Sequence, residues 1–194
     1  MKKTLFWSIL LAIIAFGAFQ GNKYLSKNSA FVFGQAIDSL NGVEVFYNGE
    51  TGNVKGRTTI DGYNIGLKYQ CVEFVKRYYF EHYKHRMPNS YGHAKSFFDP
   101  MVSDGKMNVA RNLLQFTNPS ISKPQVGDLI VMDRGSYGHV AIVSEVFENE
   151  IEIIQQNPGK RGNSRERIDL KHRSDNNWYI DKSRIVGWLR NSEN

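Results

Sequence analysis

The clearest periodic pattern in the chain begins at Cys71. Apolar side chains recur at helical spacing from there through Tyr83, while charged residues fill the other faces. The pattern predicts an amphipathic helix with the cysteine in its first turn, ended by the proline- and glycine-containing segment 88–92. A weaker helix is expected further on, at either 94–98 or 110–114.

The second half of the chain has shorter apolar runs, which predict strands. Residues 124–133 (PQVGDLIVMD) indicate a turn followed by a strand, and residues 139–147 (HVAIVSEVF) are apolar on both faces, as in a central strand. Residues 151–157 (IEIIQQN) follow a short turn, so we expect them to pair with the preceding strand as an antiparallel hairpin. A last strand is expected at 185–189.

The segment before the predicted helix is less regular. Residues 31–47 are expected to contain short strands, and the alternation within 42–49 is typical of a hairpin arm. Residues 50–66 are rich in Gly, Thr, Asn and Asp and predict a loop. A helix followed by a meandering sheet predicts an α+β domain.

The first 20 residues differ from the rest of the chain. Two lysines precede an uncharged, mostly apolar run at 5–19, which is the pattern of an export signal. As a helix this run would span roughly 22 Å, against a hydrocarbon core of about 30 Å. Gln20 stands where a cleavage site needs a small side chain, so a cleaved signal and a retained anchor both remain open.

These features predict a domain organisation and a location. We expect an exported protein of the cell envelope or the extracellular space, attached to the membrane through residues 4–19 if the anchor is retained. The expected parts are a signal peptide or anchor at 1–20, a linker at 21–30 and a single domain at 31–194.

Composition adds limits on partners. A single cysteine permits no internal disulfide, so the domain must depend on its core, which the 41% hydrophobic content can supply. The net charge of +6 and the pI near 9.3 favour anionic surroundings such as cell-wall polymers or membrane surfaces. The basic residues are scattered and form no nucleic-acid-binding motif, so nucleic acid is not an expected partner.

Cys71 and His139 are the first candidates for chemistry. A lone cysteine is most often a small buried hydrophobe, but a thiol at a helix N-terminus faces N–H groups and a dipole that favour the thiolate. His139 begins a buried strand after a tight lead-in at 137–138, so it could act as the base of a nucleophilic pair. We interpret the remaining histidines as solvated: His82, His85, His93 and His172.

Gln155 is the candidate to orient His139. Strand alternation puts the two residues opposite each other only if the turn between their strands centres on Phe147. The visible turn at 148–150 lies slightly later, so a bulge or bend would be required. The alternative is that Gln155 and Gln156 only hydrogen-bond a strand end.

Taken in order, these segments resemble a known family. YQCVEF with its tyrosine-rich helix, VGDLIV, GHVAIVSEV and QQN are similar to the CHAP domain, a family of cysteine- and histidine-dependent amidohydrolases and peptidases. Within that family the likeness is to the amidase domain of glutathionylspermidine synthetase/amidase, and it extends from about residue 33 to SRERIDL and IVGWL near the end. The resemblance implies a papain-like α+β fold, in which an N-terminal helix carrying the nucleophile packs on an antiparallel sheet. It makes Cys71 the nucleophile and His139 the base.

The third position departs from the family pattern. The usual Glu-Gln-Asn reads Gln155-Gln156-Asn157 here. A carboxylate would orient the imidazole and stabilise its cation, whereas an amide can only orient it. Papain-like proteases use an asparagine in this role, so Gln155 is compatible with activity. Asn157 matches the family's asparagine and is expected to support the site, and the main-chain N–H of Cys71, with help from Gln70, is expected to stabilise an oxyanion.

Three functions follow from these expectations. The first is an amidase or endopeptidase that cuts peptidoglycan stem peptides, favoured by the export pattern and the basic charge. The second is a glutathionylspermidine-type amidase acting on a small polyamine conjugate, and the third is a non-catalytic binder of wall peptides, favoured only by Gln155. No metal or other cofactor is expected, because the chain lacks zinc-ligand spacing, an acidic calcium loop and a phosphate-binding loop.

Overall fold

A computed structural model describes residues 31–159 and 162–192 of the chain, and the segment from Phe33 onward forms one compact unit. The expected export segment and linker at 1–30 lie outside the described residues. Among the described residues, no helix is both long enough and apolar enough to cross a membrane.

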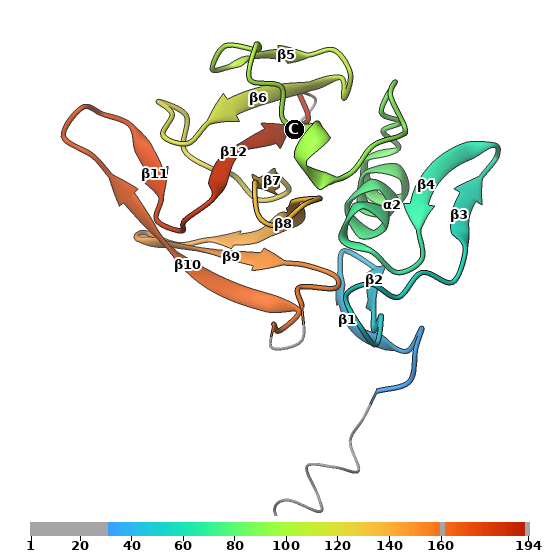
Figure 1. Ribbon diagram of the computed structural model, residues 1–194. Coiled ribbons are helices and arrows are strands. Elements are labelled where there is room, and N and C mark those ends of the chain that lie inside the picture. Colours follow the sequence, from blue (N-terminus) through green and yellow to red (C-terminus); the bar gives the residue numbers. More distant parts are fainter. Residues whose placement is uncertain (1–30, 160–161, 193–194) are drawn as a thin grey trace, which may run out of the picture. The chain divides into compact units, whose positions relative to one another are not determined.

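Most of the compact unit is one antiparallel sheet of eight strands. They are β5 (Lys106–Asn108), β6 (Leu113–Thr117), β7 (Leu129–Met132), β8 (His139–Val146), β9 (Glu150–Ile154), β10 (Arg165–His172), β11 (Trp178–Ile180) and β12 (Ile185–Arg190). Their order in the sheet is β11-β10-β9-β8-β7-β12-β6-β5 (Figure 1). The predicted strands within 124–133 and at 139–147, 151–157 and 185–189 are confirmed, and β8 and β9 form the predicted antiparallel hairpin.

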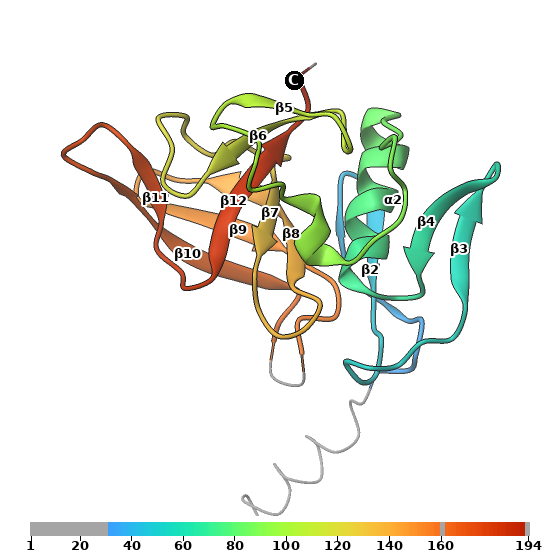
Figure 2. The ribbon, with the colours of Figure 1, turned by 45° about the horizontal axis from the view of Figure 1, so that its top comes forward.

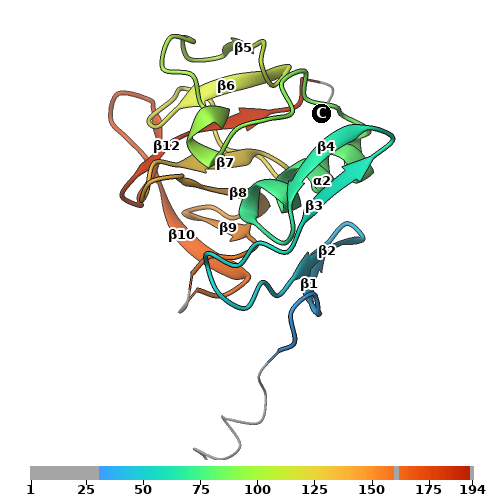
Figure 3. The same ribbon diagram turned by 45° about the vertical axis from the view of Figure 1, so that its right-hand side comes forward.

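Helix α2 (Cys71–Tyr83) confirms the strongest sequence prediction. Gln70 precedes it in an extended conformation, and Lys84 ends it in the left-handed conformation, a few residues before the expected stop at 88–92. The helix contacts β8 of the large sheet and two strands outside it, β2 (Val43–Phe46) and β4 (Tyr63–Leu67). These pair with β1 (Ala36–Leu40) and β3 (Arg57–Ile60) as hairpins that flank the helix (Figures 1 and 3).

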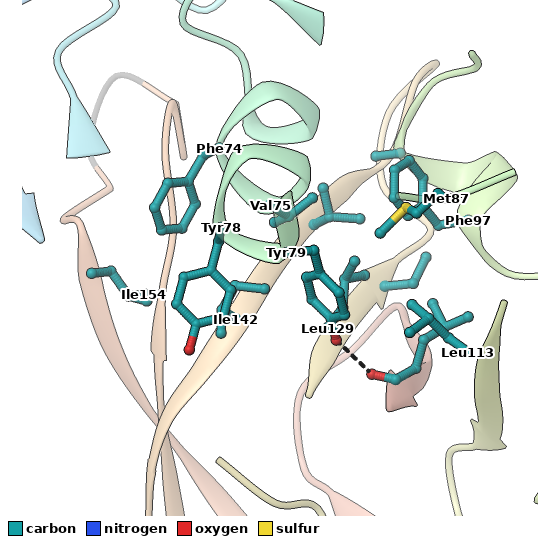
Figure 4. Close-up of a cluster of buried hydrophobic side chains, with 14 of the residues drawn as sticks. Phe74, Val75, Tyr78, Tyr79, Met87, Phe97, Leu113, Leu129, Ile142 and Ile154 are labelled. Atoms are coloured by element: carbon teal, nitrogen blue, oxygen red, sulfur yellow. Dashed lines mark hydrogen bonds between the residues drawn. The ribbon is translucent and has the colours of Figure 1, made fainter. Parts of the chain in front are cut away.

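The two faces of the large sheet carry separate apolar clusters. Helix α2 lies beside one face (Figure 2), where Phe74, Tyr78 and Tyr79 are buried with Leu129 and Ile142 (Figure 4). The buried Tyr79 hydroxyl lies 3.0 Å from the Gly127 carbonyl oxygen. The other face has its own cluster, which includes Ile153, Ile168 and Trp188. One α-helix together with mainly antiparallel sheet makes the described part of the chain an α+β fold.

The loop predicted at 50–66 was wrong, because this segment contains the β3–β4 hairpin. Its turn is Asp61-Gly62, and both residues have positive φ angles, 48° and 74°. An Asp-Gly pair supplies the two left-handed residues that a tight two-residue hairpin turn requires. The polar composition that suggested a loop therefore belongs to an exposed hairpin.

The weaker helix is found at only one of its two expected positions. A short 3-10 helix, η1 (Ala94–Phe97), covers most of 94–98. The other expectation, 110–114, is wrong because Leu113 begins strand β6. Leu114 and Phe116 of that strand pair with β12. Periodicity alone cannot tell a helix from a strand in such a short apolar run, and here the pairing with β12 makes it a strand.

Candidate active site

Cys71 is the first residue of helix α2 and is half-buried. Its thiol interacts with the main-chain N–H groups of Cys71 itself, Val72 and Val140. Val140 follows His139 at the beginning of β8. The fold therefore brings the first turn of the helix and the beginning of the central strand together, as the expected Cys–His pair requires.

Burial raises the pKa of the Cys71 thiol above its ordinary value. The hydrogen bonds from Val140 and Val72 and the positive charge of Arg134 act in the opposite direction, but they do not outweigh burial. The helix N-terminus does favour the thiolate, as the sequence suggested. In the free protein, however, loss of water around the sulfur is the larger effect, so the thiol is protonated near neutral pH.

His139 is the first residue of β8 and is 3% exposed. It follows Gly138, which has a φ of 77°. A Cβ atom at Gly138 would lie 2.8 Å from the Lys95 main-chain nitrogen and 2.9 Å from the Met132 carbonyl oxygen. Only glycine fits this close approach without displacing main chain, so the lead-in to His139 is held between η1 and β7.

His139 is hydrogen-bonded to Gln155, the residue expected to orient it. Nε2 of the imidazole lies 2.8 Å from Oε1 of the amide. The Gln155 amide nitrogen donates in the other direction, to the Asn163 carbonyl oxygen at 3.1 Å, which fixes the orientation of the amide. An amide oxygen can only accept, so Nε2 of His139 carries the proton and Nδ1 keeps a free lone pair.

A β-bulge at Ser144 decides which glutamine faces His139. Near the turn Glu145 pairs with Glu152, but beyond the bulge Val143 pairs with Ile153. Without the extra residue, Val143 would pair with Ile154, and His139 would share a face with Gln156 instead of Gln155. The bulge that the late turn demanded is therefore present, and the Ser144 hydroxyl holds it through bonds to the carbonyl and side chain of Glu152, at 3.1 and 2.9 Å.

Burial lowers the pKa of His139 from 6.5 to about 3. The positive charges of Arg134 and Lys182 lower it further, while the hydrogen bond with Gln155 raises it. Because Gln155 is a neutral amide, the residue bonded to His139 carries no negative charge that would raise its pKa against the effect of burial. The resting pair is consequently a neutral thiol and a neutral imidazole.

Gln156 has a structural role, whereas the sequence suggested only that it could hydrogen-bond a strand end. It is fully buried and points away from Gln155, toward helix α2. Its amide nitrogen donates to the Gln70 carbonyl oxygen at 3.0 Å and to Oε2 of Glu73 at 2.9 Å, and its amide oxygen accepts the Phe46 N–H at 2.8 Å. The alternation of a strand could have indicated it, because neighbouring residues must serve opposite faces of the sheet.

Gln70 and Asn157 form a second hydrogen-bonded connection at the beginning of helix α2. The Asn157 amide donates to Oε1 of Gln70 at 2.7 Å. The Gln70 amide nitrogen donates to main-chain oxygens of Asn53 at 2.9 Å and Thr51 at 3.3 Å. Asn157 thus supports the residue before Cys71, while help from Gln70 for an oxyanion stays a prediction that would require one of these bonds to be released.

The structure thus brings Cys71, His139, Gln155, Gln70 and Asn157 into one region, and their chemical roles remain predictions. Within residues 31–159 and 162–192, no three side chains of the types that bind metals cluster together.

Comparison with known proteins gives a consistent likeness. Residues 61–157, about half of the chain, match the family model described as "CHAP domain". The chain is 30% identical over 155 residues to the "Bifunctional glutathionylspermidine synthetase/amidase" of Escherichia coli (strain K12), covering 71% of this chain and 24% of that protein. It is 34% identical over 105 residues to the "Glutathionylspermidine synthase" of Crithidia fasciculata, covering 49% and 14%. The match thus spans about a quarter or less of each of these relatives.

Proposed function

Because the chain belongs to the CHAP domain family, we propose that it is a cysteine-dependent amidohydrolase or peptidase of papain-like arrangement. Cys71 is the nucleophile, His139 the general base and Gln155 the residue that orients the imidazole. The observation that carries the proposal is the 2.8 Å contact from Nε2 of His139 to Gln155, which leaves Nδ1 free on the residue just before Val140, whose main-chain N–H bonds the Cys71 thiol.

The proposed reaction begins with the neutral pair. Nδ1 of His139 takes the thiol proton as sulfur attacks the amide carbon, and the carbonyl electron pair moves to oxygen. The main-chain N–H of Cys71 donates to that oxyanion. When the C–N bond breaks, the imidazolium gives its proton to the leaving nitrogen, and a thioester remains.

Water then completes the cycle. His139 takes a proton from the water molecule as its oxygen attacks the thioester carbon, and the C–S bond breaks. The proton returns to sulfur, which releases the carboxylic acid and restores the neutral pair. Gln155 stays bonded to Nε2 throughout and keeps the ring from turning.

Charge around the site supports an anionic substrate. Arg134 acts electrostatically on both Cys71 and His139, and Lys182 acts on His139. In the described part of the chain Arg134 forms no ion pair; its guanidinium donates to the Pro158 carbonyl oxygen at 3.2 Å. A guanidinium free of a carboxylate partner suits a substrate carboxylate, such as those of peptidoglycan stem peptides. The net charge of +6 and the export pattern support the same wall substrate.

A second candidate is an amide of glutathione with a polyamine. The names printed for the relatives favour it, since they describe glutathionylspermidine synthesis and an amidase. The cations Arg134 and Lys182 count against it, because a polyamine leaving group is itself positively charged. We therefore place it second.

The test offers the full chain both purified peptidoglycan and glutathionylspermidine and identifies the products by mass spectrometry. We expect cleavage of a wall peptide, and its loss in Cys71→Ala and His139→Ala. His172→Ala is the matched control, because this histidine contacts Trp178 on the far edge of the sheet and should leave the rate unchanged. Undiminished cleavage by Cys71→Ala would refute the nucleophile assignment, and cleavage of glutathionylspermidine alone would favour the second candidate.

A further inference from the structure

Gln155 has a carboxylate behind it. The Glu166 side chain on β10 lies with Oε2 3.5 Å from the Gln155 amide nitrogen, on the side away from His139. Glu166 pairs in register with Ile153, two residues before Gln155, so both side chains project from the same face of the sheet. His139, Gln155 and Glu166 thus form a row across β8, β9 and β10, and Lys182 pairs with the far end of the row through the other Glu166 oxygen.

The two ends of the Gln155 amide have nearly the same shape, so either end could face His139. Which end does so decides the position of the imidazole proton. With Oε1 toward His139, the imidazole carries its proton on Nε2 and offers a lone pair at Nδ1. If the amide turned over, its NH2 group would donate to Nε2 and the ring proton would move to Nδ1. His139 could then no longer accept the Cys71 proton.

Two acceptors oppose that turned-over amide. The Asn163 carbonyl oxygen takes one amide hydrogen at 3.1 Å, and Glu166 lies in reach of the second. Turning the amide over would set its oxygen against both of them, so a carboxylate adds charge repulsion to the loss of two hydrogen bonds.

We propose that Glu166 is a positioning residue of the active site, which fixes the amide of Gln155 and through it the Nε2–H tautomer of His139. The inference rests on the proposed function for its catalytic consequence, but the tautomer is a property of the protein without substrate. It also explains how a neutral residue can occupy the third position: the carboxylate is supplied from the next strand and acts through the amide.

The substitution Gln155→Glu should lower the activity, although it restores the acidic residue that is usual in the family. Restoring the family's acidic residue alone would place a second carboxylate beside Glu166 and remove the donor to the Asn163 carbonyl. We expect kcat to fall about 10- to 100-fold, the size of effect known for lost outer partners of metal-binding histidines. In the double variant Gln155→Glu/Glu166→Gln, the amide at position 166 can donate to the carboxylate at position 155, so the repulsion is removed. Its kcat should recover to within about threefold of the wild-type value.

The second measurement reads the tautomer directly. In full-length protein with 15N-labelled histidine, the two ring nitrogens of His139 are followed by NMR and identified by their loss in His139→Gln. The wild type should show the Nε2–H form, and Glu166→Ala should shift His139 toward the Nδ1–H form. Asp181→Asn is the matched control, because it breaks the Lys171–Asp181 pair at the same β10–β11 edge and should leave the tautomer unchanged.

One further variant separates orientation from charge. Glu166→Ala frees Lys182, so Glu166→Ala/Lys182→Met removes that cation as well and should keep the altered tautomer. The proposal is overturned if Glu166→Ala leaves the Nε2–H form in place, if the double variant with Lys182→Met restores it, or if the effects of Gln155→Glu and Glu166→Gln simply add. If no variant and no wild type cleaves an amide, the proposed function fails while the tautomer still decides the role of Glu166.

Discussion

Cys71 and His139 are both held in their uncharged forms, and burial is the main cause at each residue. Many cysteine hydrolases rest as a thiolate and an imidazolium, which needs a polar site or a nearby carboxylate to stabilise the charges. Here the residue bonded to His139 is an amide, and the charges that act on the imidazole, those of Arg134 and Lys182, are positive. A neutral resting pair follows, in which the thiol ionises only as its proton is transferred.

Alkylation of Cys71 should therefore depend strongly on pH. Because only the thiolate reacts, the rate of modification by iodoacetamide should rise steadily from about pH 6 to pH 10, with its midpoint above that of free cysteine. The measurement is the rate constant as a function of pH, followed by mass spectrometry of the only cysteine. A plateau of high reactivity extending below about pH 6 would instead indicate a thiolate–imidazolium pair and contradict the neutral one.

Gln155 and Gln156 allow a comparison between two neighbouring residues of the same type. Gln156→Ala would leave the Phe46 N–H, the Gln70 carbonyl and the Glu73 carboxylate without this partner in a buried place. We expect it to lower the free energy of unfolding by about 1–3 kcal/mol, measured by urea denaturation. Gln155→Ala should reduce kcat more than it reduces stability. Equal effects of the two substitutions on both quantities would contradict the division of roles.

At the scale of elements, the sequence predicted what depends on local pattern. The helix at Cys71, the hairpin of 139–147 with 151–157 and the need for a bulge could all be read from periodicity and turn position. The location of the bulge at Ser144 could not, because it is fixed by side-chain bonds to Glu152 on the partner strand. Glu166 was missed for the same reason: 11 residues separate it from Gln155, and only sheet pairing brings the two together.

The attachment of α2 to the sheet gives a prediction at this scale. The buried Tyr79 hydroxyl lies 3.0 Å from the Gly127 carbonyl oxygen and 3.3 Å from that of Leu189. Tyr79→Phe removes this donor and should lower the free energy of unfolding by about 1–2 kcal/mol in urea denaturation. Tyr137→Phe, at a tyrosine that is 70% exposed, is the control and should have no measurable effect. An unchanged midpoint for Tyr79→Phe would mean that these bonds do not stabilise the helix on the sheet.

At the scale of the whole molecule, His139 links folding to pH. The pKa of His139 is about 3 in the folded protein and near 6.5 in an unfolded chain. Between these two pH values the unfolded chain therefore binds a proton at this residue that the folded protein does not bind. The stabilisation is complete above pH 6.5 and is lost as the pH falls toward 3, at roughly 1.4 kcal/mol per pH unit.

The measurement is urea denaturation at several pH values in that range, with His139→Gln as the reference. Other groups contribute to the slope: burial raises the pKa of Asp128, for example, which acts in the opposite direction. They are common to both proteins, so the difference between the two slopes isolates His139. Parallel slopes would show that His139 is protonated in the folded state and would contradict its burial as a neutral base.

The half-buried, protonated state of the Cys71 thiol also affects how easily the protein is oxidised. Peroxides attack the thiolate, and the chain has no second cysteine that could trap a sulfenic acid as an internal disulfide. A nucleophile kept permanently ionised would thus be exposed to oxidation that nothing within the chain could reverse. If the sulfur ionises only during the proposed reaction, the fold gives up intrinsic reactivity and gains resistance to oxidation.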